Sequence, residues 1–183
     1  MVIVLLANGF EESEAIVPVD MLRRAEVETV LVGVEGMTVQ SSHGVRVEAD
    51  KPLDQITLEG VELVLVPGGL GGVRGLQNSP AALDLIRRAA QAGIQLAAIC
   101  AGPTVLAGLG LLEGKEAVCY PGMEGQLTGA QARPGSQVVV SGGVTTAESA
   151  GSAFEFGLKL VERLRGREAA QAVAKASCFH GAF

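Results

Sequence analysis

Short, continuous apolar runs alternate along this chain with amphipathic segments. Runs of this kind are typical of strands that are buried on both faces of a parallel sheet, because such strands have no polar face. The strands that the pattern predicts are 2–7, 28–34, 61–66, 96–99, 116–119 and 137–140. Two shorter segments, 38–40 and 45–48, flank Ser41-Ser42-His43-Gly44 and predict a small hairpin.

The amphipathic segments between these runs predict helices at 11–25, 81–92, 104–109, 146–165 and 168–175. Ser79 precedes Pro80, so Ser79 can cap the second helix and Pro80 suits its first turn. Pro18 lies inside the first helix, and we expect it to bend or interrupt that helix. The alternation predicts an α/β fold: a single domain over residues 1–183, a three-layer flavodoxin-like sandwich with a mainly parallel central sheet.

Composition narrows the classes of function. The chain has 183 residues, of which 48% are hydrophobic and 19% charged, which allows a substantial core. Its net charge of −6 gives no electrostatic basis for binding nucleic acid or an anionic membrane. No apolar run approaches the length of a membrane span, and we expect a cytoplasmic protein.

Cysteine and histidine are sparse. Cys100, Cys119 and Cys178 are widely spaced and odd in number, which indicates neither a disulfide framework nor a Cys-x-x-Cys metal site. We interpret Cys119 as strand core, with a second redox thiol as the alternative. His43 is interpreted as a solvated turn residue and His180 as part of a frayed tail, so no metal site is expected.

Cys100 is the main candidate for chemistry. It ends a predicted buried strand and stands directly before Ala101, Gly102 and Pro103, where a helix begins. A side chain at such a turn is pushed out of the sheet toward a cleft, and the positive potential of the helix start favours the thiolate. We therefore interpret Cys100 as a reactive nucleophile-elbow cysteine; the alternative is a buried, inert cysteine.

A glycine-rich segment, residues 67–72, follows the strand 61–66 and lacks the spacing of a phosphate-binding loop. The carboxyl ends of parallel strands meet at one edge of the sheet. We therefore expect the N–H groups of Gly69 and Ala101 to face the space above the Cys100 sulfur. There they would hold an oxyanion or the oxygens of an oxidised cysteine. An ordinary tight turn is the alternative.

Three acidic residues begin the first predicted helix. Glu11 and Glu12 are explained as partners of the helix dipole. Glu14 lies one turn after Glu11, on a face that also carries Val17 or Pro18 and points inward. A carboxyl group enclosed there would have a raised pKa and could donate a proton to a thiolate or a bound substrate. Spacing alone leaves this role open.

Several of these segments closely resemble the ThiJ/PfpI superfamily, in particular the bacterial-type members of its DJ-one branch. The matching segments are Gly9-Phe10-Glu11-Glu12-Ser13-Glu14, Val17-Pro18-Val19-Asp20, Val66-Pro67-Gly68-Gly69, Ala97-Ala98-Ile99-Cys100-Ala101-Gly102-Pro103-Thr104 and Phe154-Glu155-Phe156. The resemblance implies that Cys100 is an oxidation-prone nucleophile and that Glu14 is a protonated carboxyl hydrogen-bonded to it. It also implies an oxyanion pocket of Gly69 and Ala101, with Gly68 beside it, in a homodimer that needs no cofactor.

The function that this resemblance implies is a cysteine-dependent glyoxalase or deglycase acting on reactive dicarbonyls or on glycated proteins, with protection against oxidative stress. The alternative is a non-catalytic redox sensor or redox-regulated chaperone that acts through oxidation of Cys100. Protease-like members of the superfamily have a His where this chain has Ala101, so the general acid–base partner for peptide hydrolysis is missing.

Two positions depart from the animal members of the branch. Cys119-Tyr120-Pro121 stands in a segment where the animal members have a His, and Tyr120 could orient a substrate oxygen in the pocket. Glu148 stands where they have an Arg, next to the pocket. A carboxylate at Glu148 would repel an anionic substrate or product.

Overall fold

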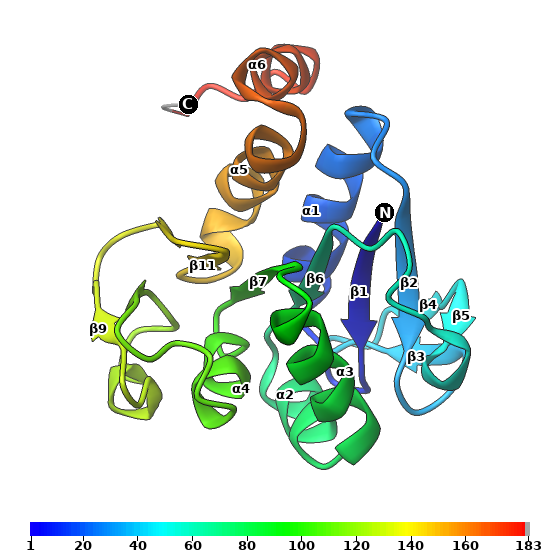
Figure 1. The fold of residues 1–183 in the computed structure, drawn as a ribbon. Coiled ribbons are helices and arrows are strands. Elements are labelled where there is room, and N and C mark those ends of the chain that lie inside the picture. Colours follow the sequence, from blue (N-terminus) through cyan, green and yellow to red (C-terminus); the bar gives the residue numbers. More distant parts are fainter. Residues whose placement is uncertain (182–183) are drawn as a thin grey trace.

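A seven-stranded sheet runs through the centre of the computed structural model, which describes residues 1–181 (Figure 1). Its strands follow the order β10-β11-β7-β6-β1-β2-β5. Their bounds are β1 Val2–Leu6, β2 Thr29–Gly33, β5 Lys51–Pro52, β6 Leu63–Val66, β7 Gln95–Ile99, β10 Val138–Ser141 and β11 Val144–Ala147. Neighbouring strands of this sheet are parallel, except that β10 and β11 form an antiparallel pair. The mainly parallel sheet and the flavodoxin-like class are confirmed.

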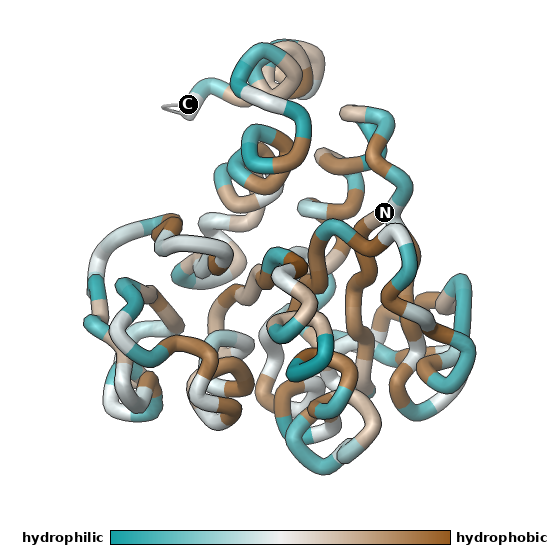
Figure 2. The backbone as a smooth tube through the Cα atoms, in the orientation of Figure 1, coloured by the Kyte–Doolittle hydropathy of each residue, from teal (hydrophilic) through white to brown (hydrophobic). Residues whose placement is uncertain are grey.

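Helices cover both faces of the sheet and make two separate cores. One core lies under α2 (Leu70–Gln77), α3 (Pro80–Gln91) and α4 (Pro103–Gly108), and the other lies under α1 (Glu12–Arg24), α5 (Ala153–Arg165) and α6 (Arg167–Ala176). Residues of β1 alternate between these cores, which is why its sequence is apolar throughout. Figure 2 shows this hydrophobic interior as brown strands between helices with teal outer faces.

The remaining elements are short and lie outside the central sheet. The predicted hairpin is confirmed as β3 (Thr38–Gln40) paired antiparallel with β4 (Arg46–Glu48). The predicted strand 116–119 is reduced to β8 (Glu116–Ala117), which pairs with β9 (Gln131–Ala132). Single turns of 3-10 helix are η1 (Leu53–Gln55), η2 (Glu124–Gln126) and η3 (Ala150–Ser152). Among the described residues, no helix is both long and apolar enough to cross a bilayer.

The predicted helix 146–165 is wrong over its first turns. Residues Val144–Ala147 form strand β11, which lies beside β7, and α5 begins only at Ala153. All four strand residues are buried and three of them are β-branched, a combination that suits a pleated surface better than a helix. The error matters for the site, because the backbone of β11 supports the end of β7.

The first helix is not interrupted at Pro18: α1 runs unbroken from Glu12 to Arg24, and α5 packs against it. The glycine-rich segment is more than the ordinary tight turn of the alternative interpretation, because α2 begins within it at Leu70. Glycines are needed there because a Cβ on Gly71 would lie 2.9 Å from Gly9 Cα, and one on Gly72 would lie 2.8 Å from Phe10 Cα.

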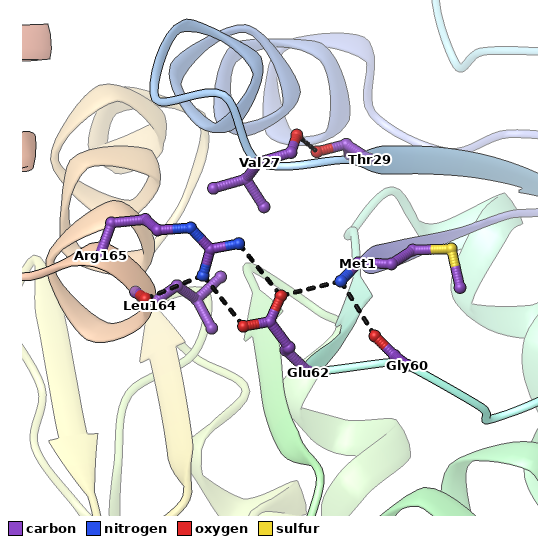
Figure 3. A network of polar contacts seen from close by, with 7 residues as sticks. All are labelled: Met1, Val27, Thr29, Gly60, Glu62, Leu164 and Arg165. Atoms are coloured by element: carbon purple, nitrogen blue, oxygen red, sulfur yellow. Dashed lines mark hydrogen bonds and ion pairs between the residues drawn. The ribbon is translucent and has the colours of Figure 1, made fainter.

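An ion-pair network ties the end of α5 to the loop before β6 (Figure 3). Glu62 accepts hydrogen bonds from Arg165 at 2.9 and 3.1 Å and from the Met1 amine at 2.8 Å, and that amine also donates to the Gly60 carbonyl at 3.0 Å. The hydrogen bonds from Arg165 and then from the Met1 amine lower the pKa of Glu62 to about 2. The network therefore joins the end of α5 to the residues that precede the neighbouring strands β1 and β6.

The contact between α1 and α5 yields a stability prediction. A Cβ on Gly157 would lie 2.9 Å from Pro18 Cα and 2.9 Å from Met21 Cγ. We expect Gly157→Ala to lower the free energy of unfolding by about 1–3 kcal/mol in urea titrations, although Ala is the better helix former by roughly 1 kcal/mol. Gly108→Ala in α4, where a Cβ meets nothing within 4 Å, is the control and should not destabilise. Equal stability of both variants would contradict this packing argument.

The Glu62 network yields a pH prediction. Because the folded pKa of Glu62 lies below its ordinary value of 4.5, the ionised carboxylate stabilises the fold above that value, and this contribution is lost as the pH falls toward about 2. Glu62 and Arg165 are 40% and 33% exposed, so the contribution at neutral pH is below about 1 kcal/mol. We expect Glu62→Gln to be slightly less stable than wild type at pH 7 and equal to it in strong acid, as measured by chemical denaturation at each pH.

Candidate active site

Cys100 is held in a strained turn at the end of β7. Its φ of +63° lies in the left-handed region, which non-glycine residues seldom adopt. Hydrogen bonds on both sides fix this conformation: the Cys100 N–H donates to Ala147 O of β11 at 3.0 Å, and the Tyr120 N–H donates to Cys100 O at 2.8 Å. The predicted elbow is therefore present, and the Cys100 side chain reaches the wall of a cavity.

Glu14 approaches Cys100 from the first turn of α1. Its side chain is 1% exposed, as the inward-facing helix position predicted, and it hydrogen-bonds to the Cys100 thiol. Its Oε2 atom also accepts from the Gly68 N–H at 3.0 Å. A Cβ on Gly68 would lie 2.3 Å from that oxygen and 2.6 Å from Cys100 Cβ, so glycine is required for the carboxyl and the thiol to meet.

The pKa of Glu14 is raised, which confirms the expectation from sequence. Burial is the largest cause, the negative charge of Glu11 also raises the pKa, and the net result is a pKa of about 7. Hydrogen bonds to the carboxylate from Cys100 and from the backbone of Gly68 and Ala150 act in the opposite direction. The carboxyl group can therefore both accept and donate a proton near neutral pH.

The expectation of an ionised sulfur is wrong when Glu14 carries its charge. Burial of the thiol and then the neighbouring Glu14 charge raise the pKa of Cys100 to about 12. These effects outweigh the start of α4, a helix of six residues. A thiol with this pKa is protonated at neutral pH, so it becomes nucleophilic only when a base removes its proton, and the Glu14 carboxyl is the acid–base group beside it.

The two predicted backbone donors lie beside the sulfur. Hydrogen bonds from the Ala101 and Gly69 backbone lower the pKa of Cys100, against the larger effect of burial. Gly69 has a φ of +84°, and a Cβ on it would lie 2.4 Å from Gly9 O, so its N–H can approach only because the residue is glycine. The two donors are placed where negative charge on or next to the sulfur would be stabilised.

These groups open onto a cavity of about 1060 Å³ at the carboxyl ends of the strands. It is lined by Gly9, Glu11, Glu14, Ser42, His43, Gly69, Leu70, Gly71, Cys100, Ala101, Tyr120, Pro121, Gly122, Met123, Gln126, Ser149 and Ala150. The predicted pocket residue Tyr120 is present and half exposed. Gly68 lies behind the carboxyl of Glu14 instead of lining the cavity. Glu148 does not line it either, although Ser149 and Ala150 do.

Sequence reasoning missed several lining residues because they come from segments that are remote along the chain. Ser42 and His43 belong to the β3–β4 hairpin, and Met123 and Gln126 belong to the segment after β8. The His43 side chain is 74% exposed, as predicted for a turn residue, yet it stands at the cavity wall. Cys119 is 2% exposed and belongs to the core as expected, although it lies after β8 and not in a strand.

One group of side chains has ligand atoms close enough to surround a cation. Carboxylate oxygens of Glu11 and Glu12 and a ring nitrogen of His43 lie within 4.8 Å of one another. Glu11 already accepts from the Glu14 N–H at 2.8 Å, and His43 lies 3.2 Å from Glu12. The helix N-terminus at this point also disfavours positive charge. We therefore interpret the group as a helix cap beside a surface ion pair.

The contact between Glu14 and Cys100 yields a prediction for thiol reactivity. In wild type, the rate of Cys100 alkylation by iodoacetamide should rise through the titration of Glu14 near pH 7. In Glu14→Gln this step near pH 7 should disappear, because the amide cannot take up the thiol proton, and the rate should rise only with ionisation of the thiol itself at higher pH. Rates are read for the Cys100 peptide by mass spectrometry in a Cys178→Ser background, since Cys178 is exposed. An unchanged pH profile in Glu14→Gln would exclude this proton transfer.

Known proteins resemble this chain in both sequence and structure. Residues 1–163 match the model of the DJ-1/PfpI family. The chain is 39% identical over 175 residues to protein dj-1beta of Drosophila melanogaster, covering 94% of each chain. It is 31% identical over 176 residues to a Caenorhabditis elegans protein named glutathione-independent glyoxalase DJR-1.2, covering 96% of this chain and 94% of that protein. The structure of oxidized Toxoplasma gondii DJ-1 superposes with a TM-score of 0.93 at 36% identity, covering 98% of each chain. Because the family model matches residues 1–163 and the relatives match nearly the whole length, this chain belongs to the DJ-1/PfpI family.

Proposed function

We propose that this protein is a cysteine-dependent enzyme of the glyoxalase or deglycase type, which acts on reactive dicarbonyls or on their protein adducts. The observation that carries the proposal is the contact between the Cys100 thiol and a buried Glu14 carboxyl whose pKa is about 7. A base with this pKa is suited to take and return protons at neutral pH. The naming of the C. elegans relative as a glutathione-independent glyoxalase supports the same direction.

The first step that this geometry favours is addition of the thiol to the aldehyde carbon of a ketoaldehyde. The sulfur forms a bond to carbon while its proton passes to the Glu14 carboxylate. The carbonyl electron pair moves onto oxygen, where the N–H groups of Gly69 and Ala101 stabilise the developing charge. Protonation of that oxygen by Glu14 gives a hemithioacetal.

The second step is an internal rearrangement. Glu14 removes the proton from the former aldehyde carbon and returns it to the neighbouring carbon, while the proton of the hemithioacetal hydroxyl passes to the ketone oxygen. The hydroxyl thereby becomes a carbonyl and the ketone becomes an alcohol, so the hemithioacetal is converted into a thioester of a 2-hydroxy acid. Water then cleaves the carbon–sulfur bond, which releases the hydroxy acid and restores the thiol. One water is consumed, the aldehyde carbon is oxidised and the ketone carbon is reduced, so no external oxidant, reductant or cofactor is required.

The cavity is large enough for a substrate bigger than a free dicarbonyl, in addition to the dicarbonyl itself. Its volume of about 1060 Å³ lies just above the range of roughly 300–1000 Å³ for sites that enclose drug-sized ligands. The outer wall includes Leu70 and Tyr120, which are 58% and 50% exposed. An adduct attached to a side chain of another protein could therefore enter, which supports the deglycase form of the proposal.

Turnover of methylglyoxal tests the proposal. Wild type should produce lactate without an added thiol, Cys100→Ala should be inactive, and Glu14→Gln should lose about 10²- to 10⁴-fold in kcat/KM because proton transfer is lost. Cys178→Ala is the matched control, since that cysteine is exposed and does not line the cavity. Activity that survives in Cys100→Ala would refute the mechanism.

The second candidate function is a redox sensor. It is favoured by the same surroundings of the sulfur, because the Gly69 and Ala101 donors and a protonated Glu14 could hold the oxygens of a sulfinate. Selective oxidation of Cys100 by peroxide in a protein without methylglyoxal turnover would favour this candidate. Protective activity that persists in Cys100→Ala would favour a chaperone. A homodimer stays a prediction from the family resemblance, and a cytoplasmic location stays a prediction from the sequence.

A further inference from the structure

Glu11, Gly68 and Glu14 form a closed ring of hydrogen bonds beside the site. The Glu11 N–H donates to Gly68 O at 3.1 Å, the Gly68 N–H donates to Glu14 Oε2 at 3.0 Å, and the Glu14 N–H donates to Glu11 Oε2 at 2.8 Å. The last of these bonds is the cap at the N-terminus of α1. The backbone and the side chain of Glu14 are thus each fixed by one member of the ring.

The Glu11 side chain also places a second carboxylate at the same cavity. Glu11, Glu14 and Cys100 all line its wall, and among the described lining residues neither Lys nor Arg balances them. Among the described residues that line the cavity, His43 is the one basic side chain. Its Nδ1 atom lies 3.2 Å from Glu12 Oε2. Four neighbouring groups influence the pKa of Glu14. They are Cys100 at the end of β7, the Gly68 backbone before α2, the Ala150 backbone of η3 and the Glu11 carboxylate.

We infer that Glu11 is a positioning residue, which holds Glu14 against Cys100 through the ring of hydrogen bonds and disfavours the ionised form of Glu14 by like-charge repulsion. Glu11 does not need to touch a substrate for this role. Its cap fixes the first helical turn, and its charge makes Glu14 a stronger base toward the thiol proton. Interaction with the helix dipole, the usual explanation of an acidic residue at a helix start, accounts for the position of Glu11 at the cap. It does not account for the effect of the Glu11 charge on Glu14.

A pair of variants of equal size separates the cap from the charge. Asp and Asn are both good N-cap residues, and they differ in charge alone. The measurement is the pH midpoint of Cys100 alkylation by iodoacetamide in the Cys178→Ser background, together with the thermal midpoint of each variant. In Glu11→Asp the pH midpoint should stay near that of wild type. In Glu11→Asn it should fall by roughly 0.5 to 1 pH unit, the size expected for two carboxylates on one helical turn.

Glu12→Gln is the matched control. Glu12 lies one residue further along the same turn, but it faces His43 and does not line the cavity, so its loss should leave the midpoint unchanged. Equal midpoints in Glu11→Asp and Glu11→Asn, or an equal shift in Glu12→Gln, would overturn the inference. If Glu11→Asn fails to fold, Glu11→Gln gives the same comparison against wild type. Alkylation does not require turnover, so this result is independent of whether the protein is a glyoxalase.

Discussion

The site depends on one buried contact, between the carboxyl of Glu14 and the thiol of Cys100. Burial makes a charge on either group costly, and the Glu14 charge raises the pKa of Cys100 further. The carboxyl therefore keeps its proton up to about pH 7, above the range of a free carboxyl, and the thiol keeps its own proton to a much higher pH. In the mechanism proposed above, Cys100 reacts by passing its proton to Glu14 and not as a permanently ionised sulfur.

Several backbone segments have the conformation that the contact between Glu14 and Cys100 requires. Gly68 has no side chain, because a Cβ would overlap both partners, and its N–H holds the carboxyl in place. β11 supports the strained backbone of Cys100 through the Ala147 carbonyl. The backbone of Gly69 reaches the sulfur through a positive φ that glycine adopts without strain. The rigid sheet thus carries the strain that the elbow stores.

Much of the architecture could be predicted because each feature has a local cause. The apolar runs of β1 and β6 identify buried strands, and Ser79 and Pro80 identify the start of α3, where the cap to the Ala82 N–H is present. Glu14 could be placed inward from helical spacing. The errors occur where packing overrides a local pattern: Val144–Ala147 form a strand because they lie beside β7, and α1 continues through Pro18 because α5 packs against it.

By itself, the sequence determined the alternation of strands and helices, the elbow position of Cys100 and the family that these motifs identify. Only the tertiary structure decided the protonation chemistry, because a pKa depends on burial and on charges from segments that are remote along the chain. It also decided which residues form the cavity, bringing His43 and Met123 to the wall and leaving Glu148 outside it. Sequence motifs show which chemical groups the chain contains, whereas the distances between those groups and their solvent exposure decide their chemistry.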